Sequence, residues 1–215
     1  MLKVIVADDE DLVRSSLRAI LSTAPDVELV AECDDGHQVD EAVRMHRPHV
    51  VLLDIRMGET DGITALKAIT GMPEPPAVCM LTTFDVDEYV RRALRLGASG
   101  FLLKDVDPAY LIKAVHDLAA GGVVLDPTVA ARVVGALAQG EQAAEPAREA
   151  LASLSGRERD VVALIGRGLS NAEIGQALHL SEATVKGYVS AVLGKIGASN
   201  RVQAALVAYR GGLIA

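Results

Sequence analysis

Side chains that can take part in phosphoryl chemistry stand where short aliphatic runs of the sequence end. They are three carboxylates, one hydroxyl and one amine, namely Asp8, Asp9, Asp54, Thr82 and Lys104. If the runs are strands of one parallel sheet, their carboxyl ends share an edge, and these side chains converge there. The sequence therefore predicts a single polar site at that edge.

Three carboxylates at one edge predict a bound cation, because they repel one another strongly when no cation lies between them. Oxygen ligands with room for water suit Mg²⁺. The alternative is that Asp8, Asp9, Glu10 and Asp11 only cap the helix that follows and favour its dipole. That alternative does not account for Asp54, which ends an aliphatic run and precedes a polar loop.

A carboxylate beside a metal, a hydroxyl and a cation suits the transfer of a phosphoryl group onto that carboxylate. Mg²⁺ would neutralise the oxygens of the incoming group, and Thr82 and Lys104 would bind those oxygens after the transfer. Thr83 follows Thr82 directly and is the alternative hydroxyl if the strand ends one residue later.

The pattern of apolar residues predicts the elements that position this site. Over residues 1–120, aliphatic runs alternate with segments of helical spacing. This alternation predicts an α/β, doubly wound, five-stranded parallel sheet of the flavodoxin-like kind. The predicted strands are residues 2–7, 27–31, 49–54, 77–82 and 99–103. The predicted helices are residues 11–21, 36–45, 62–69, 86–96 and 108–119.

The rest of the chain is predicted to be a linker and a small all-α domain of four helices. Residues 121–150 are predicted to hold an extra helix at 128–138 and a polar, alanine-rich interdomain linker. In residues 151–215 the predicted helices are 156–167, 171–177, 182–196 and 200–210. The predicted N-caps of these helices are Ser155, Ser170, Ser181 and Ser199, the first two within capping boxes.

The net charge leads to opposite predictions for the whole chain and for its parts. The formal charge of −8 for the 215 residues argues, taken alone, against a nucleic-acid partner. Residues 1–150 carry −11, whereas residues 151–215 hold seven basic and four acidic residues and carry +3. The C-terminal domain is therefore mildly basic, and the predicted Mg²⁺ site accounts for part of the remaining acidity.

The cysteines and the apolar runs predict a cytoplasmic location without a membrane partner. Cys33 and Cys79 form no disulfide framework and no metal-ligand spacing. No apolar run approaches the length of about 18 residues that a membrane span needs. The first residues turn acidic too early for a secretory signal.

Four motifs of residues 1–120 occur in order: Val6-Ala-Asp8-Asp9-Glu10, Leu52-Leu-Asp54-Ile-Arg56-Met57, Leu81-Thr82-Thr83 and Gly97-Ala-Ser-Gly-Phe101-Leu-Leu-Lys104-Asp105. They resemble the receiver domain of two-component response regulators. The resemblance implies that Asp54 is the phospho-acceptor. It implies that Mg²⁺ is held by Asp8, Asp9, Asp54 and the backbone carbonyl of Arg56. It also implies that Thr82 and Lys104 contact the phosphoryl group and that Phe101, often tyrosine in relatives, is a rotameric switch. The alternative for Phe101 is a fixed core residue.

The predicted helix 182–196 has an apolar stripe and an opposite face of small residues. Gly187 lies in mid-helix, where glycine costs about 1 kcal/mol relative to alanine. Its missing side chain would let the helix sit close to base edges in a major groove; tolerance within a stable bundle is the alternative. The short helix and tight turn before it give a helix-turn-helix spacing. In that arrangement Ser181 and Thr184 can contact phosphates.

A second set of motifs follows: Leu154-Ser155-Gly-Arg157-Glu158-Arg-Asp, Gly168-Leu-Ser-Asn171-Ala-Glu173-Ile174, Leu180-Ser181-Glu182-Ala-Thr184-Val185-Lys186 and Lys195-Ile196. They resemble the LuxR/FixJ-type DNA-binding domain. The resemblance implies DNA contacts at Lys186, Gly187, Ser190 and Lys195. In the last helix the apolar spacing predicts bundle core, with a dimer contact as the alternative, for Val202, Ala205, Leu206 and Tyr209.

Together the two resemblances indicate a NarL/FixJ-type response regulator. The predicted function is control of transcription through DNA binding. A sensor histidine kinase would activate it by phosphorylating Asp54 with Mg²⁺ bound. Homodimerisation would follow, with binding to paired half-sites on double-stranded DNA. One alternative is a turnover phosphotransferase of the haloacid-dehalogenase type. Such an enzyme would carry a D-x-D motif, whereas Asp8 and Asp9 are adjacent, so no turnover enzyme is expected. The other alternative is a regulator that signals by binding alone.

Overall fold

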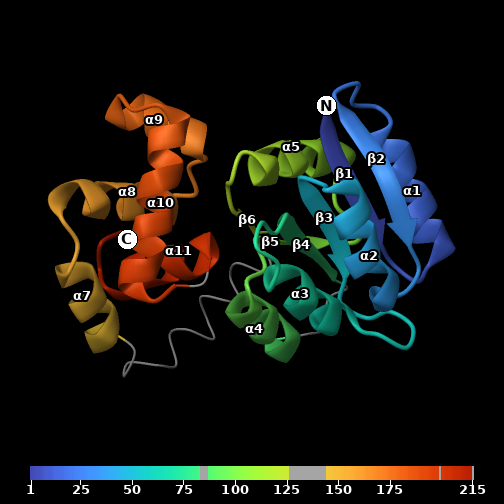
Figure 1. Cartoon of the computed structure of the whole chain (residues 1–215), viewed down its shortest axis with the longest axis horizontal. Helices are drawn as coiled ribbons and strands as arrows, with labels where there is room; N and C mark the ends of the chain where they lie inside the picture. Colours follow the sequence, from blue (N-terminus) through green and yellow to red (C-terminus); the bar gives the residue numbers. More distant parts are fainter. Residues whose placement is uncertain (83–86, 126–143, 199, 215) are drawn as a thin grey trace.

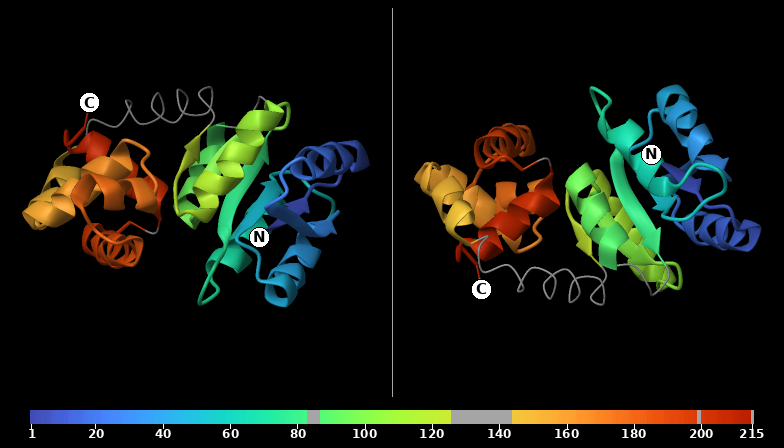
Figure 2. Two further views of the ribbon diagram at one scale, coloured as in Figure 1. Left: turned by 90° about the horizontal axis from the view of Figure 1, so that it is seen from above. Right: turned by 90° about the horizontal axis from the view of Figure 1, so that it is seen from below.

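A computed structural model of the chain describes residues 1–82, 87–125, 144–198 and 200–214. An α/β region, up to residue 125, and an all-α region, from residue 144, lie side by side along the long axis of the molecule (Figure 1). Two further views show the helices of the all-α region gathered at one end, apart from the sheet (Figure 2). The extra helix predicted at residues 128–138 lies outside the described residues.

The α/β region is built on a parallel sheet with the order β2-β1-β3-β4-β5-β6. Its strands are β1 (Leu2–Ala7), β2 (Val27–Cys33), β3 (Val50–Asp54), β4 (Ala77–Thr82), β5 (Gly100–Leu103) and β6 (Val124–Leu125). The five predicted strands are confirmed to within two residues. The predicted number of strands is one too low, because β6 has two residues and is too short to show an apolar period.

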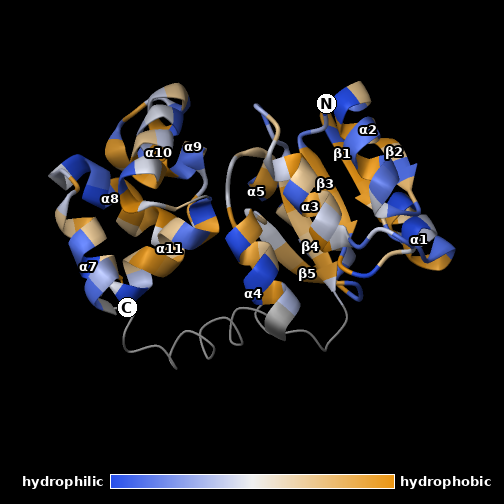
Figure 3. Ribbon diagram, turned by 60° about the horizontal axis from the view of Figure 1, so that its bottom comes forward, coloured by the Kyte–Doolittle hydropathy of each residue, from blue (hydrophilic) through white to orange (hydrophobic). Residues whose placement is uncertain are grey.

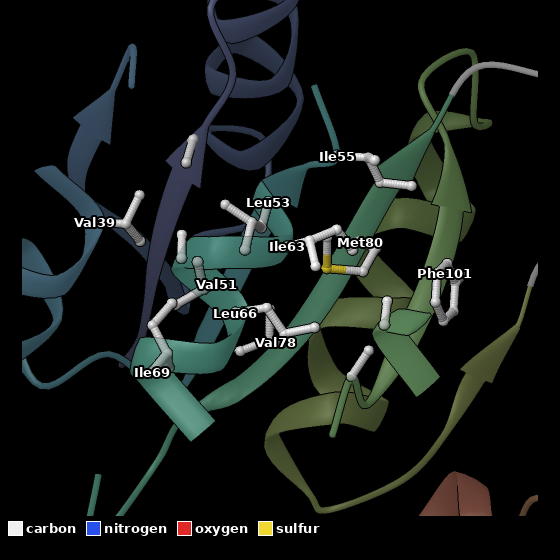
Figure 4. Packing of buried hydrophobic residues seen from close by; sticks show 14 of the residues in the cluster. Val39, Val51, Leu53, Ile55, Ile63, Leu66, Ile69, Val78, Met80 and Phe101 are labelled. Carbon is white, nitrogen blue, oxygen red and sulfur yellow. The ribbon is translucent and has the colours of Figure 1, made fainter. Parts of the chain in front are cut away.

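Helices cover both faces of the sheet. The helices of this region are α1 (Asp11–Leu21), α2 (Gly36–His46), α3 (Gly62–Thr70), α4 (Asp87–Leu96) and α5 (Pro108–Ala119). One core lies between the sheet and helices α2, α3 and α4, where Leu53, Ile63 and Met80 pack together (Figure 4). Helices α1 and α5 enclose a second core on the other face. The strands are apolar and the outer helix faces polar (Figure 3), as expected for a sheet buried on both sides.

The all-α region has one helix more than the four predicted. Its helices are α7 (Ala144–Ala152), α8 (Gly156–Gly166), α9 (Asn171–Leu178), α10 (Glu182–Ile196) and α11 (Arg201–Arg210). Helix α7 occupies part of the predicted linker. It forms because alanine favours helix, Pro146 falls in the first turn where no N–H partner is needed, and Ala147 and Leu151 are buried beside α11.

The caps of the all-α region agree with the predictions except at α11. The capping boxes at Ser155 and Ser170 and the N-cap at Ser181 are confirmed. The N-cap of α11 is Asn200 instead of the predicted Ser199, which lies outside the described residues. The asparagine side chain accepts a hydrogen bond from the backbone N–H of Gln203. None of the helices in the described ranges has the length and apolar run that crossing a membrane requires.

Helix α11 packs against helix α4 of the α/β region. Val202 is buried in the core cluster of the α/β region, and Leu206 packs against the same cluster. Ala205 packs within the all-α region, and Tyr209 is exposed. The apolar stripe of α11 is therefore divided between bundle core and a contact between the two regions, a use that the spacing alone does not predict.

Candidate functional site

The register of the central strands brings the predicted site residues together at the carboxyl edge of the sheet. Ala7 of β1 pairs with Leu53 of β3, so the residues that follow them, Asp8 and Asp54, are neighbours. Thr82 of β4 pairs with Leu103 of β5, which places Lys104 next to the threonine. The backbone N–H of Lys104 donates to the Thr82 carbonyl at 3.0 Å. Convergence at this edge is what the strand ends predict.

The ammonium group of Lys104 lies among three carboxylates. Its Nζ is 2.9 Å from Asp54 Oδ2, 3.0 Å from Asp8 Oδ2 and 2.8 Å from Glu10 Oε1. The Asp8 and Asp54 side chains are buried, whereas that of Glu10 is mostly exposed. Lys104 therefore compensates the negative charge of two largely buried carboxylates.

The pKa values of the site follow from burial and from Lys104. Burial raises the pKa of Asp54 to about 6, against the lowering effect of its hydrogen bond with Lys104. Burial likewise raises the pKa of Asp8. Burial alone would lower the pKa of Lys104, but its close pairing with the carboxylates of Glu10, Asp54 and Asp8 raises it overall. The carboxylates thus carry an electrostatic cost that a further cation would relieve.

A cavity of about 270 Å³ opens at these side chains and contains most of the predicted site. Its lining residues are Asp9, Glu10, Asp54, Ile55, Arg56, Thr82 and Lys104. Thr82 is 5% exposed, and the alternative hydroxyl of Thr83 lies outside the described residues. Phe101 is fully buried on β5 and pairs with Met80 of β4 in the core (Figure 4).

The acidic cluster fits a divalent cation. Asp8, Asp9 and Glu10 can each offer an oxygen, and these oxygens lie within 4.8 Å of one another. Asp8 Oδ2 is buried and accepts no aligned hydrogen bond from the described residues, although Lys104 Nζ is 3.0 Å away. A buried carboxylate oxygen rarely stays without such a bond. Oxygen donors of this kind match the preference of Mg²⁺.

The turn between α9 and α10 has helix-turn-helix geometry. His179 takes a left-handed conformation, with φ of 55°. The N–H of Leu180 donates to the Gly175 carbonyl at 2.8 Å. A Cβ on Gly175 would lie 2.7 Å from the Leu180 carbonyl oxygen, so this close turn requires glycine. The turn fixes α9 and α10 against each other and leaves one side of α10 outside the bundle.

Five of the six predicted DNA-contact residues form one exposed surface at the start and middle of α10. They are Ser181, Thr184, Lys186, Gly187 and Ser190. A Cβ on Gly187 would meet nothing within 4 Å, so no packing among the described residues explains this glycine. Lys195 is also exposed, near the end of α10, and its Nζ donates to both oxygens of Glu158 at 2.8 and 2.9 Å. That pairing lowers the pKa of Glu158 to about 2 and holds α10 to α8.

Two further carboxylates belong to the neighbourhood of the site, although the sequence patterns did not place them there. From its place before the first helix, Glu10 was expected to cap that helix, but its side chain pairs with Lys104. Its position directly after Asp8 and Asp9 was the feature of the sequence that could have placed it at the site. Asp35 contacts the loop that follows Asp54, through the N–H groups of Glu59 and Thr60. Asp35 is 24 positions from Glu59 and 25 positions from Thr60 in the sequence, so no local pattern reveals this contact.

Two protein families match this chain, one over each region. The family described as response regulator receiver domain matches residues 4–116. The family described as bacterial regulatory proteins, luxR family, matches residues 152–208. The fold and the site thus define a receiver domain combined with a LuxR-type helix-turn-helix domain. The chain belongs to the two-component response regulators that carry a LuxR-type DNA-binding domain.

Known proteins resemble the chain over nearly its full length. The transcriptional regulatory protein LnrK of Bacillus subtilis (strain 168) is 36% identical over 218 residues, covering 99% of each chain. The DNA-binding transcriptional activator DevR/DosR of Mycobacterium tuberculosis is 33% identical over 208 residues, covering 97% of this chain and 94% of the relative. The solved structure of the response regulator ChrA, from a heme-sensing two-component system, is 34% identical with a TM-score of 0.55, covering 99% and 98%. The predicted response-regulator class is confirmed, and its two domains imply a histidine kinase and DNA as partners.

Proposed function

We propose that Asp54 accepts a phosphoryl group from a phosphohistidine of a sensor kinase, and that this modification controls DNA binding by α10. The observation that carries the proposal is the position of Asp54 in an open cavity, with Lys104 Nζ at 2.9 Å and Asp8 beside it. An anionic nucleophile, a cation and a hydroxyl within one cavity are the groups that phosphoryl transfer to a carboxylate needs. The receiver family of residues 4–116 supports the same assignment.

In the proposed reaction, a carboxylate oxygen of Asp54 attacks the phosphorus of phosphohistidine. The new P–O bond forms as the P–N bond breaks, and the imidazole nitrogen leaves with the electron pair. Lys104 then exchanges part of its contact with Asp54 for the phosphoryl oxygens, and the Thr82 hydroxyl donates to them. Asp8, Asp9, Asp54 and the backbone carbonyl of Arg56 would hold Mg²⁺. When bound, the ion neutralises oxygens of the transferring group.

The proposed DNA-binding unit is residues 151–215, and α7 packs on its helices α10 and α11. Its proposed DNA contacts are the exposed residues Ser181, Thr184, Lys186, Gly187, Ser190 and Lys195. Lys195 also pairs with Glu158 of α8. The charge of +3 on residues 151–215 makes a single unit a weak binder. Binding of a phosphorylated homodimer to paired half-sites, in the cytoplasm, would supply the missing affinity.

The contact between the two domains supports a closed, inactive form. Asn200 Nδ2 donates to the carbonyls of Leu94 and Ala98, at 3.4 and 2.9 Å, and Gln203 Nε2 donates to the Leu94 carbonyl at 2.9 Å. Lys186, one of the proposed DNA contacts, lines a cavity of about 520 Å³ together with residues of the receiver domain. Because α4 follows Thr82 closely in sequence, we propose that phosphorylation shifts α4 and weakens these contacts.

Selection of bound DNA fragments tests the proposed function directly. Genomic fragments are incubated with the full-length protein, with and without acetyl phosphate and Mg²⁺, and the retained fragments are sequenced. We expect one recurring pair of half-sites, enriched only with the phosphodonor. Retention without sequence preference under both conditions would contradict the proposal, and equal enrichment under both would favour a regulator that signals by binding alone.

Asn200→Asp is expected to raise the DNA affinity of the unphosphorylated protein by about 10-fold, equivalent to about 1.4 kcal/mol. The carboxylate still accepts from the Gln203 N–H, so α11 keeps its cap. It has no donor for the Leu94 and Ala98 carbonyls and repels them instead. Added negative charge alone would lower DNA affinity, so a rise cannot come from charge.

Fluorescence anisotropy with a labelled half-site pair measures this effect. The phosphorylated forms of the wild type and of Asn200→Asp serve as the control, and their affinities are expected to be similar because the contact is already released. Gln203→Glu should act in the same direction as Asn200→Asp. Unchanged or lower affinity of both unphosphorylated variants would argue that this contact does not restrain α10.

A further inference from the structure

The loop between β3 and α3 carries the Arg56 backbone carbonyl and is packed too closely for ordinary side chains. Gly58 has φ of 23°, and a Cβ there would lie 2.3 Å from Asp35 Oδ2. A Cβ on Gly62, the first residue of α3, would lie 1.8 Å from the Asp54 carbonyl oxygen. The path of this loop therefore depends on close backbone contacts with its surroundings.

Asp35 supplies the contacts that hold the middle of this loop. Its Oδ2 accepts the backbone N–H groups of Glu59 at 2.7 Å and Thr60 at 3.2 Å. Its Oδ1 accepts the N–H of His37 at 2.9 Å and caps α2. Next to it, the Gly36 N–H donates to the Thr60 carbonyl at 3.2 Å, and a Cβ on Gly36 would lie 2.5 Å from that oxygen. One largely buried carboxylate thus joins the start of α2 to the loop.

Two carboxylates, those of Asp35 and Asp9, accept hydrogen bonds from the backbone of this loop. Asp35 is not among the residues that would hold the metal, whereas Asp9 is. The Gly58 N–H donates to Asp9 Oδ2 at 3.4 Å. Asp9 is itself a proposed Mg²⁺ ligand, so replacing it would remove a ligand together with this hydrogen bond. Replacing Asp35 changes the loop contacts alone and leaves every proposed ligand in place. The backbone N–H groups around Asp35 hold its pKa well below its usual range, so its charge persists.

We propose that Asp35 is a positioning residue for the Mg²⁺ site, because its carboxylate holds the β3–α3 loop so that the Arg56 carbonyl is presented to the acidic cluster. The inference rests on the proposed function of that cluster. Some residues do not touch the metal but hold its ligands in place by hydrogen bonds. Replacing such residues typically lowers metal affinity by about 10- to 100-fold. Asp35 would act in this way through the loop backbone, without touching the metal.

The test measures Mg²⁺ affinity and phosphoryl uptake in full-length Asp35→Ala and Asp35→Asn. Isothermal titration with Mg²⁺ is expected to give a Kd at least about 10-fold higher for Asp35→Ala. The rate of uptake from acetyl phosphate should fall at low Mg²⁺ and recover at saturating Mg²⁺. Asp35→Asn keeps one acceptor oxygen for either the loop or α2, so its Kd should lie between those of Asp35→Ala and the wild type.

Asp107→Ala is the matched control. Asp107 accepts the N–H groups of Ala109 and Tyr110 at the start of α5, so its loss also removes two backbone hydrogen bonds. It should lower the thermal midpoint measured by circular dichroism without changing the Mg²⁺ Kd. If Asp35→Ala does not fold, Asp35→Asn carries the test. A wild-type Kd in the folded Asp35 variants overturns the inference, and a wild type that binds no Mg²⁺ overturns the proposed function and the inference with it.

Discussion

Replacing Asp54 by alanine is expected to abolish phosphoryl uptake. In the wild type, incubation with acetyl phosphate and Mg²⁺ should add about 80 Da, the mass of one phosphoryl group, to the intact protein. Asp54→Ala should show none of this species, because the attacking oxygen is gone and the neighbouring Asp8 is fully buried. Loss of folding is not expected, because removing a buried carboxylate whose pKa is raised to about 6 relieves an unfavourable charge at neutral pH.

Two controls separate this result from general damage to the acidic cluster. Asp11→Ala removes an exposed carboxylate that pairs with Arg14, and its uptake should match that of the wild type. Chelation of Mg²⁺ should suppress uptake in the wild type without changing the protein. If Asp54→Ala gained the added mass as fully as the wild type, the phospho-acceptor would be another residue. If the wild type gained no added mass, signalling by binding alone would be favoured.

The main features of the receiver domain could be predicted because they depend on local sequence. Aliphatic runs buried on both sides of a parallel sheet remain visible as runs, and the carboxyl ends of such strands must meet at one edge. For that reason the sequence predicts the convergence of Asp8, Asp54 and Lys104, which the strand register confirms. The individual distances, and the place of Glu10 on Lys104, depend on side-chain conformations that a pattern does not contain.

The features that escaped prediction depend on contacts between distant segments. Helix α7 has few large apolar residues, and its burial comes from α11, which lies about 60 residues further along the chain. The contacts of Asn200 with Leu94 and Ala98 cross from one domain to the other. The ion pair of Lys195 with Glu158 joins two helices whose paired residues are 37 positions apart in the sequence. In each case tertiary packing determined the outcome, and residue type alone did not.

Lys104→Met is expected to destabilise the receiver domain in a manner that depends on pH and Mg²⁺. Methionine keeps most of the side-chain stem but removes the cation beside two buried carboxylates. At pH 8, where these groups must ionise, the free energy of unfolding should fall by roughly 3 kcal/mol, as when one partner of a buried ion pair is lost. Urea denaturation of the full-length protein, followed by circular dichroism at pH 5 and pH 8, measures the difference.

The sign of the pH effect follows from Asp54. Its folded pKa of about 6 is above the ordinary value of 3.8, so its contribution to stability is greatest below 3.8 and is lost as the pH rises through 6. Removing Lys104 raises that folded pKa further, so the variant should lose more stability than the wild type between pH 5 and pH 8. Added Mg²⁺ should restore part of the loss, since the metal supplies positive charge to the same oxygens. Glu10→Gln removes the exposed partner of Lys104 and should cost less than about 1 kcal/mol. Equal destabilisation of Lys104→Met at both pH values, unaffected by Mg²⁺, would mean that Lys104 contributes through the packing of its stem, not through its charge.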